Sequence, residues 1–170
     1  MDLSEVMISE QEIADMVDRV AAQINNDYQG EELIVVSVLT GGFVFTADLV
    51  RKLTMPVKID FVQAKSYSGT TSTGELLIKK DISMDIEGKN VLIVEDIIDT
   101  GNTLKKLKEY LLSRNPKSLK LCTAFDKPDR RVNDLTSDYN GIVIPDEFIV
   151  GYGLDYDDSF RNFKEVRIVR

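Results

Sequence analysis

The sequence predicts an α/β protein with a central parallel sheet. Strand-like segments alternate with segments whose apolar residues recur at helical spacing; residues 91–94 are continuously apolar, and residues 33–39 are apolar except for Ser37. Continuous runs of this length are typical of parallel strands buried on both faces, and the alternation is typical of strands joined by helices. Ligands of such sheets bind beyond the carboxyl ends of the strands. The loops expected to meet at that edge follow Leu39, Val62, Val94 and Phe125.

The first part of the chain predicts two helices and two strands. Ser9 followed by Glu12 forms a capping box, which indicates the start of a helix. Thr40-Gly41-Gly42 turns the chain from a strand into a helix, and Pro56 ends that helix. In order, the elements are a helix from Ser9 to about Asn26, a strand at 33–39, a helix at 43–53 and a strand at 57–62.

The remainder continues the alternation. Residues 64–74 contain no apolar aliphatic residue beyond Ala64, so we expect a loop there. We expect the last strand at the edge of the sheet, because its apolar residues alternate with polar ones. The elements are strands at 76–78, 91–94, 119–125, 141–145 and 166–169, and a helix from Thr103 to about Ser113.

Composition bounds the class of protein. The chain has 170 residues, 43% of them hydrophobic, which suits one domain with a substantial core. A net charge of −8 argues against a nucleic-acid duplex or an anionic membrane as the main partner. No apolar run approaches the length of a membrane span. The single cysteine, Cys122, cannot form an intrachain disulfide, which suits a cytoplasmic location, and we expect it to be a core residue rather than a nucleophile.

The chain contains no histidine. This excludes Ser-His and Cys-His catalytic machinery and any metal site with histidine ligands. Acid–base chemistry must therefore use carboxylates, lysine or tyrosine.

The segment 95–103 combines two chemistries that normally oppose each other. Thr100, Gly101 and Thr103 lie at the start of a predicted helix, where backbone N–H groups and hydroxyls can bind a phosphate. The carboxylates of Glu95, Asp96 and Asp99 would repel that phosphate if they faced it. A ribose 5-phosphate satisfies both groups, because carboxylates can accept hydrogen bonds from the sugar diol. Mg²⁺, which prefers oxygen ligands, could share the acidic side.

Three other stretches are open to two interpretations. Residues 39–42 could form an anion-binding nest or only a tight turn, and 65–74 could be a functional lid or only a flexible hairpin loop. The residues of 148–156 could bind a ligand or pack in the core.

The segment from Val91 to Thr103 resembles the phosphoribosyl pyrophosphate (PRPP) motif of the type I phosphoribosyltransferases: an apolar strand, two acids, then Asp-Thr-Gly-x-Thr. Residues 148–156 resemble the segment that marks family members acting on 6-oxopurines, and the chain as a whole is most similar to the short bacterial members. The resemblance covers the chain from about Ser9 to Arg170. It implies one domain, 1–170, with a mostly parallel twisted sheet flanked by helices and a small hood from the N- and C-terminal parts. Its parts would be a lid loop at about 65–75, a PRPP loop at 95–103 and a purine-binding hood at about 127–161.

The resemblance implies roles for the residues of the PRPP loop. Glu95 and Asp96 would bind the ribose diol, either directly or through Mg²⁺. Asp99 would lie near N7 of the base and act as the general acid or base. The cradle of the 5-phosphate would be Thr100, Gly101, Asn102 and Thr103.

The resemblance also places the other ligand groups. Many relatives carry Lys or Arg where this chain has Thr40, and a cis peptide often precedes the glycines, so we expect the backbone of this loop to carry the binding. Pyrophosphate would be held by Leu39, Thr40, Gly41, Gly42 and Arg161, and the purine by Lys127, Phe148, Ile149 and Asp155. Metal binding would fall to Glu95, Asp96 and Asp155, and the lid to Lys65, Ser66 and Tyr67. Arg131 would lie near the base and pyrophosphate.

The implied activity is the transfer of the 5-phosphoribosyl group from PRPP to N9 of hypoxanthine or guanine, with Mg²⁺ as cofactor and pyrophosphate as the second product. A homodimer or homotetramer is expected from the family, with pairing through Phe43, Val44 or Phe45. Two alternatives stay open. One is a PRPP-sensing regulator of the same fold without turnover, and the other is a phosphoribosyltransferase for xanthine, adenine or a pyrimidine.

Overall fold

The computed structural model describes residues 1–67 and 75–170. Within them, a six-stranded sheet has the order β4-β3-β2-β5-β6-β7. The strands pair in parallel, except that β3 pairs with β4 in antiparallel fashion. Its strands are β2 (Leu33–Val38), β3 (Val57–Tyr67), β4 (Glu75–Lys80), β5 (Asn90–Ile98), β6 (Ser118–Asp126) and β7 (Tyr139–Val143). The predicted α/β class with a mostly parallel sheet is confirmed.

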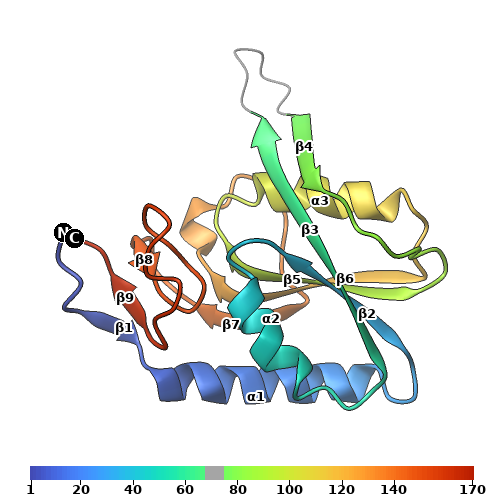
Figure 1. Ribbon diagram of the computed structural model, residues 1–170, viewed down its shortest axis with the longest axis horizontal. Helices are drawn as coiled ribbons and strands as arrows, with labels where there is room; N and C mark the ends of the chain where they lie inside the picture. Colours follow the sequence, from blue (N-terminus) through green and yellow to red (C-terminus); the bar gives the residue numbers. More distant parts are fainter. Residues whose placement is uncertain (68–74) are drawn as a thin grey trace.

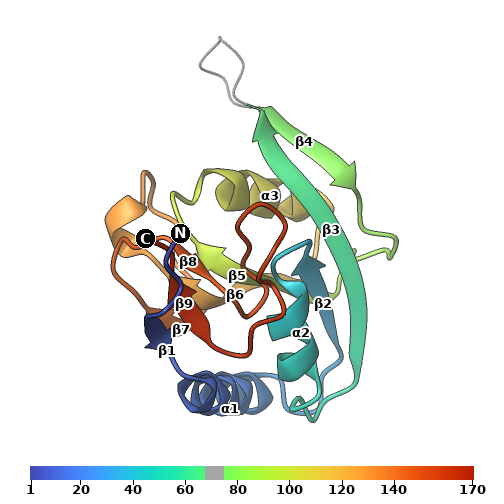
Figure 2. The same cartoon turned by 60° about the vertical axis from the view of Figure 1, so that its left-hand side comes forward.

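Helices cover both faces of this sheet. Figure 2 shows α3 (Asn102–Leu112) on one face, with α1 (Glu10–Asp27) and α2 (Phe43–Val50) on the other. The predicted start of the first helix is confirmed, because the Ser9 hydroxyl accepts a hydrogen bond from the Glu12 N–H at 3.1 Å. The second helix ends three residues before the predicted Leu53.

The core has two layers because successive residues of a strand point to opposite faces. On β5, Leu92 and Val94 join the layer under α1 and α2, whereas Val91 and Ile93 join the layer under α3. Cys122 is fully buried, as expected for a core residue, and burial raises the pKa of its thiol. Phe45 is also fully buried, so the expectation that it could pair with a second copy is wrong, whereas Phe43 is exposed.

The predicted hood is a second sheet of three short antiparallel strands, in the order β1-β9-β8. These strands are β1 (Val6–Ile8), β8 (Ile149–Val150) and β9 (Val166–Ile168). The two ends of the chain lie side by side (Figure 1), joined by hydrogen bonds between the backbones of Asp2 and Arg170. The expectation that the last strand lies at an edge is wrong, because β9 lies between two strands too short to be seen in the sequence.

Two of the strands that are longer than predicted, β3 and β5, extend toward the site. β3 continues to Tyr67, where it pairs with β4. β5 continues through Glu95 and Asp96 to Ile98, so these two acids lie in the strand and not in the loop after it. β5 stays extended because β6 continues to pair with it as far as Asp126. Among the described residues, no helix is both long enough and apolar enough to cross a membrane.

Candidate active site

A small pocket lies where β5 passes into α3. Gly101 stands at the N-cap of α3 with a φ of +85°, a conformation that favours glycine. Gly101 has no side chain to cap this helix, so apart from a long contact of the Asn102 N–H with Thr100 Oγ1 at 3.3 Å, the N–H groups of its first turn are available to an anion. The pocket has a volume of about 130 Å³. It is lined by Glu95 and by every residue from Ile97 to Leu104.

Two threonines add hydroxyl groups to this pocket. The Thr100 hydroxyl accepts a hydrogen bond from the Asn102 N–H at 3.3 Å. The Thr103 hydroxyl lies 2.6 Å from the Ser66 hydroxyl, so a predicted lid residue contacts the predicted phosphate cradle. The rest of the lid prediction, residues 68–74 and the side chain of Tyr67, lies outside the described residues.

Glu95 and Asp96 bring two carboxylates to the end of β5: Glu95 lines the pocket, and the carboxylate of Asp96 lies beside Gly41. Burial raises the pKa of both side chains, and the negative charge of Asp96 raises that of Glu95 further. Hydrogen bonds from the backbone and the positive charge of Arg161 act in the opposite direction on Asp96. Two acids whose charged forms are disfavoured together suit a ligand that supplies a cation or hydroxyl donors.

Asp99 follows β5 and is held by two consecutive arginines. Arg130 donates from Nε to Asp99 Oδ1 at 2.9 Å, and both side chains are 47% exposed. Arg131 donates from Nε to the Asp99 carbonyl at 3.3 Å. The remaining Arg131 donors bind the Leu135 carbonyl and the buried carboxylate of Asp126. The guanidinium of Arg131 thus binds protein groups, although the family resemblance places this residue near the base and pyrophosphate.

Lys127 lies at the end of β6, next to the end of β5. Its N–H donates to the Ile98 carbonyl at 2.9 Å, which places it one residue from Asp99. Only 7% of the residue is exposed. Within the described residues, its ammonium makes no ion pair or hydrogen bond with the protein. The Lys127 ammonium is therefore free to donate a hydrogen bond to an acceptor atom on a bound ligand.

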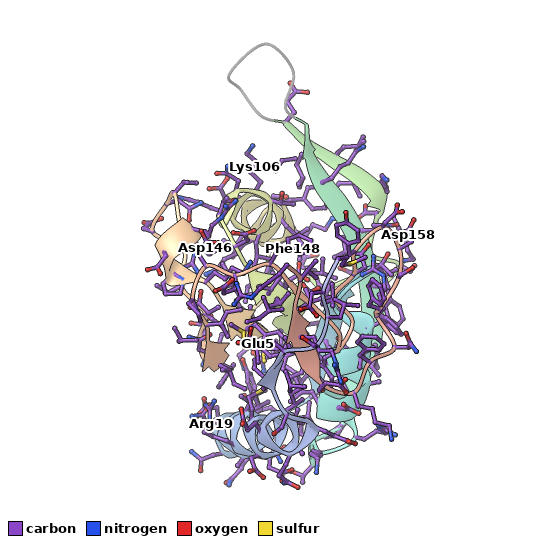
Figure 3. The ribbon with its side chains drawn as sticks, turned by 90° about the vertical axis from the view of Figure 1, so that its left-hand side faces the viewer. Glu5, Arg19, Lys106, Asp146, Phe148 and Asp158 are labelled. Carbon is purple, nitrogen blue, oxygen red and sulfur yellow. The ribbon has the colours of Figure 1, made fainter. Side chains whose placement is uncertain are left out.

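Two aromatic side chains form an exposed apolar surface on the hood. Phe148 is 51% exposed and lies on the side of the molecule that faces the viewer in Figure 3. Its ring meets Tyr156 edge to face at 5.7 Å. The next residue, Ile149, is buried in β8. A core role for Phe148 is thus excluded, and a planar ligand could stack on it.

The loop after β2 depends on close packing. The peptide bond between Leu39 and Thr40 is cis, as the family resemblance implies. A Cβ on Gly41 would lie 1.9 Å from Asp96 Oδ2, and one on Gly153 would lie 2.2 Å from the Gly41 carbonyl oxygen. The Thr40 side chain is exposed. The loop is therefore packed between β5 and the hood.

Arg161 is held by residues of its own C-terminal segment. Its Nη1 donates to the Gly153 carbonyl at 2.7 Å, and its Nη2 forms an ion pair with Asp155 at 3.4 Å. Within residues 1–67 and 75–170, no three acidic or cysteine side chains are grouped closely enough to hold a metal ion. Asp155 is therefore not gathered with Glu95 and Asp96 into one set of ligands.

Several residues near the site were not predicted. Arg130 and Tyr156 lie inside stretches singled out by sequence, but nothing in the sequence showed which side chains they would meet. Buried hydroxyls also support the loop after β2: Ser37 contacts Thr46 at 2.7 Å, and Thr46 donates to the Gly42 carbonyl at 2.7 Å. The sequence did offer one indication of this contact, because Ser37 is a polar residue inside an otherwise apolar strand.

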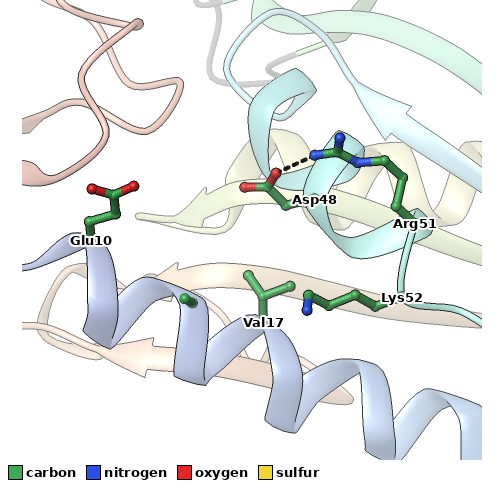
Figure 4. A pocket seen from close by; sticks show the side chains of 6 residues that line it. Glu10, Val17, Asp48, Arg51 and Lys52 are labelled. Atoms are coloured by element: carbon green, nitrogen blue, oxygen red, sulfur yellow. Dashed lines mark hydrogen bonds and ion pairs between the residues drawn. The ribbon is translucent and has the colours of Figure 1, made fainter.

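A larger pocket, of about 430 Å³, lies between α1 and α2 (Figure 4). Three of its four charged side chains are paired, Asp48 with Arg51 at 2.8 Å and Lys52 with Asp18 at 2.6 Å. None of the predicted site residues lines it. Choosing the pocket with the greater volume would therefore have missed the candidate active site.

Comparisons with known proteins show the family to which the chain belongs. A model of the phosphoribosyl transferase domain matches residues 7–157. Hypoxanthine-guanine phosphoribosyltransferase of Staphylococcus aureus is 47% identical over 162 residues, 95% of this chain and 90% of the relative. Hypoxanthine phosphoribosyltransferase of Salmonella typhimurium is 48% identical over 95% of this chain and 93% of the relative. A crystal structure of a hypoxanthine-guanine phosphoribosyltransferase from Bacillus anthracis superposes with a TM-score of 0.95 at 48% identity, covering 99% of this chain and 100% of that one.

Proposed function

The chain belongs to the phosphoribosyltransferase family, and we propose that it transfers the 5-phosphoribosyl group from PRPP to N9 of hypoxanthine or guanine. The products are the purine nucleotide and pyrophosphate. The protein is thus an enzyme of purine salvage, in line with the names of its relatives.

One observation carries the assignment. The Lys127 N–H to Ile98 hydrogen bond of 2.9 Å joins the phosphate pocket to a nearly buried lysine that has no protein acceptor among the described residues. A lysine ammonium donates only, so it suits the 6-oxo oxygen of hypoxanthine or guanine and not the 6-amino group of adenine. Phe148 supplies a face for the purine ring, and Ile149 supplies backbone groups.

The reaction uses this arrangement to position two reactants. The purine N9 forms a bond to C1′ of the ribose while the bond from C1′ to the pyrophosphate oxygen breaks, and its electron pair leaves with pyrophosphate. The proton on N7 passes to the Asp99 carboxylate. Orientation and electrostatic stabilisation of the charge on the ribose provide most of the catalysis.

The 5-phosphate binds in the pocket at the start of α3, through its N–H groups and the hydroxyls of Thr100 and Thr103. Asn102 contributes its backbone. Pyrophosphate binds along residues 39–42 through the backbone, because the Thr40 side chain carries no charge, and Arg161 supplies the cation.

Mg²⁺ fits the acidic side of the site. Glu95 and Asp96 offer oxygen ligands in a partly buried place that raises the pKa of both, and a cation would favour their charged forms. These two residues would hold the ion or the ribose diol, and Asp155 would contact a second ion. When bound, Mg²⁺ neutralises the charge of the pyrophosphate that leaves.

Ser66, with Lys65 and Tyr67, would exclude water from the reacting C1′ centre, which water otherwise attacks. The contact between Ser66 and Thr103 supports this role, since it already joins β3 to the phosphate pocket.

Self-association as a homodimer or homotetramer is also proposed. Phe43 on α2 and Ile59 and Phe61 on β3 are exposed, and Ile59 and Phe61 point to the same face of the sheet. Light scattering should give a mass above that of one chain, and Phe43→Ser should lower that mass.

A cytoplasmic location is proposed from the single, buried thiol of Cys122.

A competition assay tests the assignment. The protein is incubated with PRPP, Mg²⁺ and equal amounts of hypoxanthine, guanine, xanthine and adenine, and each nucleotide and the released pyrophosphate are quantified. Hypoxanthine and guanine nucleotides should dominate. A predominance of xanthine nucleotide would assign xanthine as the substrate. PRPP binding without pyrophosphate release would favour a regulator without turnover.

A further inference from the structure

We propose that Arg130 is a positioning residue for Asp99, holding one carboxylate oxygen so that the other is aimed at the purine N7. This inference rests on the proposed function, because it assigns a role within that reaction. It concerns a residue that sequence reasoning did not select.

The backbone places Arg130 beside the end of β5. Residues Pro128–Arg130 form the short 3-10 helix η1, whose start suits proline because that position needs no N–H donor. The Arg130 N–H donates to the Lys127 carbonyl at 3.1 Å, and the Lys127 N–H donates to Ile98 at 2.9 Å. One turn therefore sets both the lysine that reads the base and the arginine that faces Asp99.

The contact with Asp99 uses one oxygen only. Arg130 Nε lies 2.9 Å from Asp99 Oδ1, and within the described residues no hydrogen bond reaches Oδ2. The Asp99 carbonyl is held at the same time by Arg131. With the backbone and one oxygen fixed, the second oxygen has a defined direction and a free lone pair for the N7 proton.

The neighbouring pair shows that this contact has no evident role in holding the fold. Arg131 and Asp126 are 11% exposed and form part of the protein interior, whereas Arg130 and Asp99 are 47% exposed at the pocket rim. Exposed ion pairs of this kind contribute little to stability. Removing the Arg130 side chain should therefore leave a folded protein in which Asp99 is free to rotate.

The test is a double-mutant cycle on the full chain, with hypoxanthine and PRPP as substrates. Arg130→Ala should lower kcat about tenfold, as expected for loss of orientation, while the KM for PRPP stays within about twofold. Arg130→Lys should recover part of kcat, since an ammonium can still bind Oδ1. In the Asp99→Asn background, Arg130→Ala should produce no further loss. Arg170→Ala, which removes an exposed arginine paired with Glu5 at 3.1 Å, is the matched control and should leave kcat unchanged.

The outcomes separate the two proposals. Equal losses from Arg130→Ala in the wild-type and Asp99→Asn backgrounds would overturn the positioning role while leaving the activity assigned. An unchanged kcat in Arg130→Ala, or a loss that appears in the KM for PRPP alone, would also overturn it. A wild-type protein that releases no pyrophosphate with any purine would overturn the proposed function itself, and the inference with it. Circular dichroism of each variant confirms that the losses do not come from unfolding.

Discussion

Two loops at the carboxyl ends of the neighbouring strands β2 and β5 are both assigned to phosphate groups, yet they are built in different ways. The loop after β5, residues 99–103, offers hydroxyls and a helix start, with Gly101 in the left-handed region. The loop after β2, residues 39–42, offers backbone, and its shape depends on contacts with Asp96 and Gly153. The first loop carries its own phosphate-binding groups, with Arg130 and Arg131 holding Asp99 at its start, whereas the shape of the second loop depends on residues of other segments. Substitutions inside the first loop should therefore remove binding groups directly, whereas the second loop should respond to changes made outside it.

The largest effect is expected from the loop after β5. Asp99→Asn keeps the shape of the side chain but removes the proton acceptor, so kcat should fall roughly 10³-fold while the KM for PRPP stays near normal. Steady-state kinetics with hypoxanthine measures both constants. Asp18→Asn, an exposed acid on α1, is the control. An unchanged kcat would remove Asp99 from proton transfer and reduce this loop to a phosphate cradle.

The loop after β2 should respond to a change made in the hood. Gly153→Ala places a Cβ 2.2 Å from the Gly41 carbonyl oxygen at a φ of +99°, so the loop must shift. The KM for pyrophosphate in the reverse reaction should rise roughly 100-fold, because misplacement of about 1 Å has effects of this size.

Gly30→Ala separates backbone strain from the clash in this test. Gly30 has a φ of +74° and nothing within 4 Å of a Cβ, so its substitution carries a similar strain without a steric conflict. Each variant should lose about 1–3 kcal/mol of unfolding free energy from strain, measured by chemical denaturation. If Gly30→Ala also raised the KM for pyrophosphate, contact between the hood and this loop would not explain the effect.

A smaller effect should follow from removing one hydroxyl of the phosphate pocket. Thr103→Val conserves shape but deletes a hydrogen-bond donor to a charged phosphate, and the KM for PRPP should rise about tenfold with kcat nearly unchanged. Thr54→Val, an exposed threonine between α2 and β3, provides the matched control. A wild-type KM in Thr103→Val would mean that the backbone alone binds the 5-phosphate, making the two loops alike.

The smallest effect is expected from giving the loop after β2 the charge that it lacks. Thr40→Lys should lower the KM for pyrophosphate about threefold at low ionic strength, and the gain should disappear at high salt because the side chain is exposed. The reverse reaction, followed at two salt concentrations, measures this. A gain that survives high salt would indicate a buried contact in place of a screened one.

The sequence predicted the class of fold, the sheet of buried strands and the strand-loop-helix unit around residues 95–103. It did not reveal β1 and β8, because strands of three and two residues carry no periodic pattern. Their length also explains why β9 was expected at an edge. Glu95 and Asp96 were placed in a loop because acids usually end strands, but pairing with β6 holds them in β5.

What the sequence determined by itself is local. The phosphate pocket at the start of α3 depends on a strand end, a glycine that can adopt positive φ and a helix start, all within a short stretch of chain. What only the tertiary structure decided is contact between distant segments: Gly41 against Asp96, Gly153 against Gly41, and Arg130 against Asp99 across 31 positions. Backbone preference is a property of each residue and its neighbours in sequence. The partner of a glycine or an arginine depends on how strands and loops pack, which local preference does not specify.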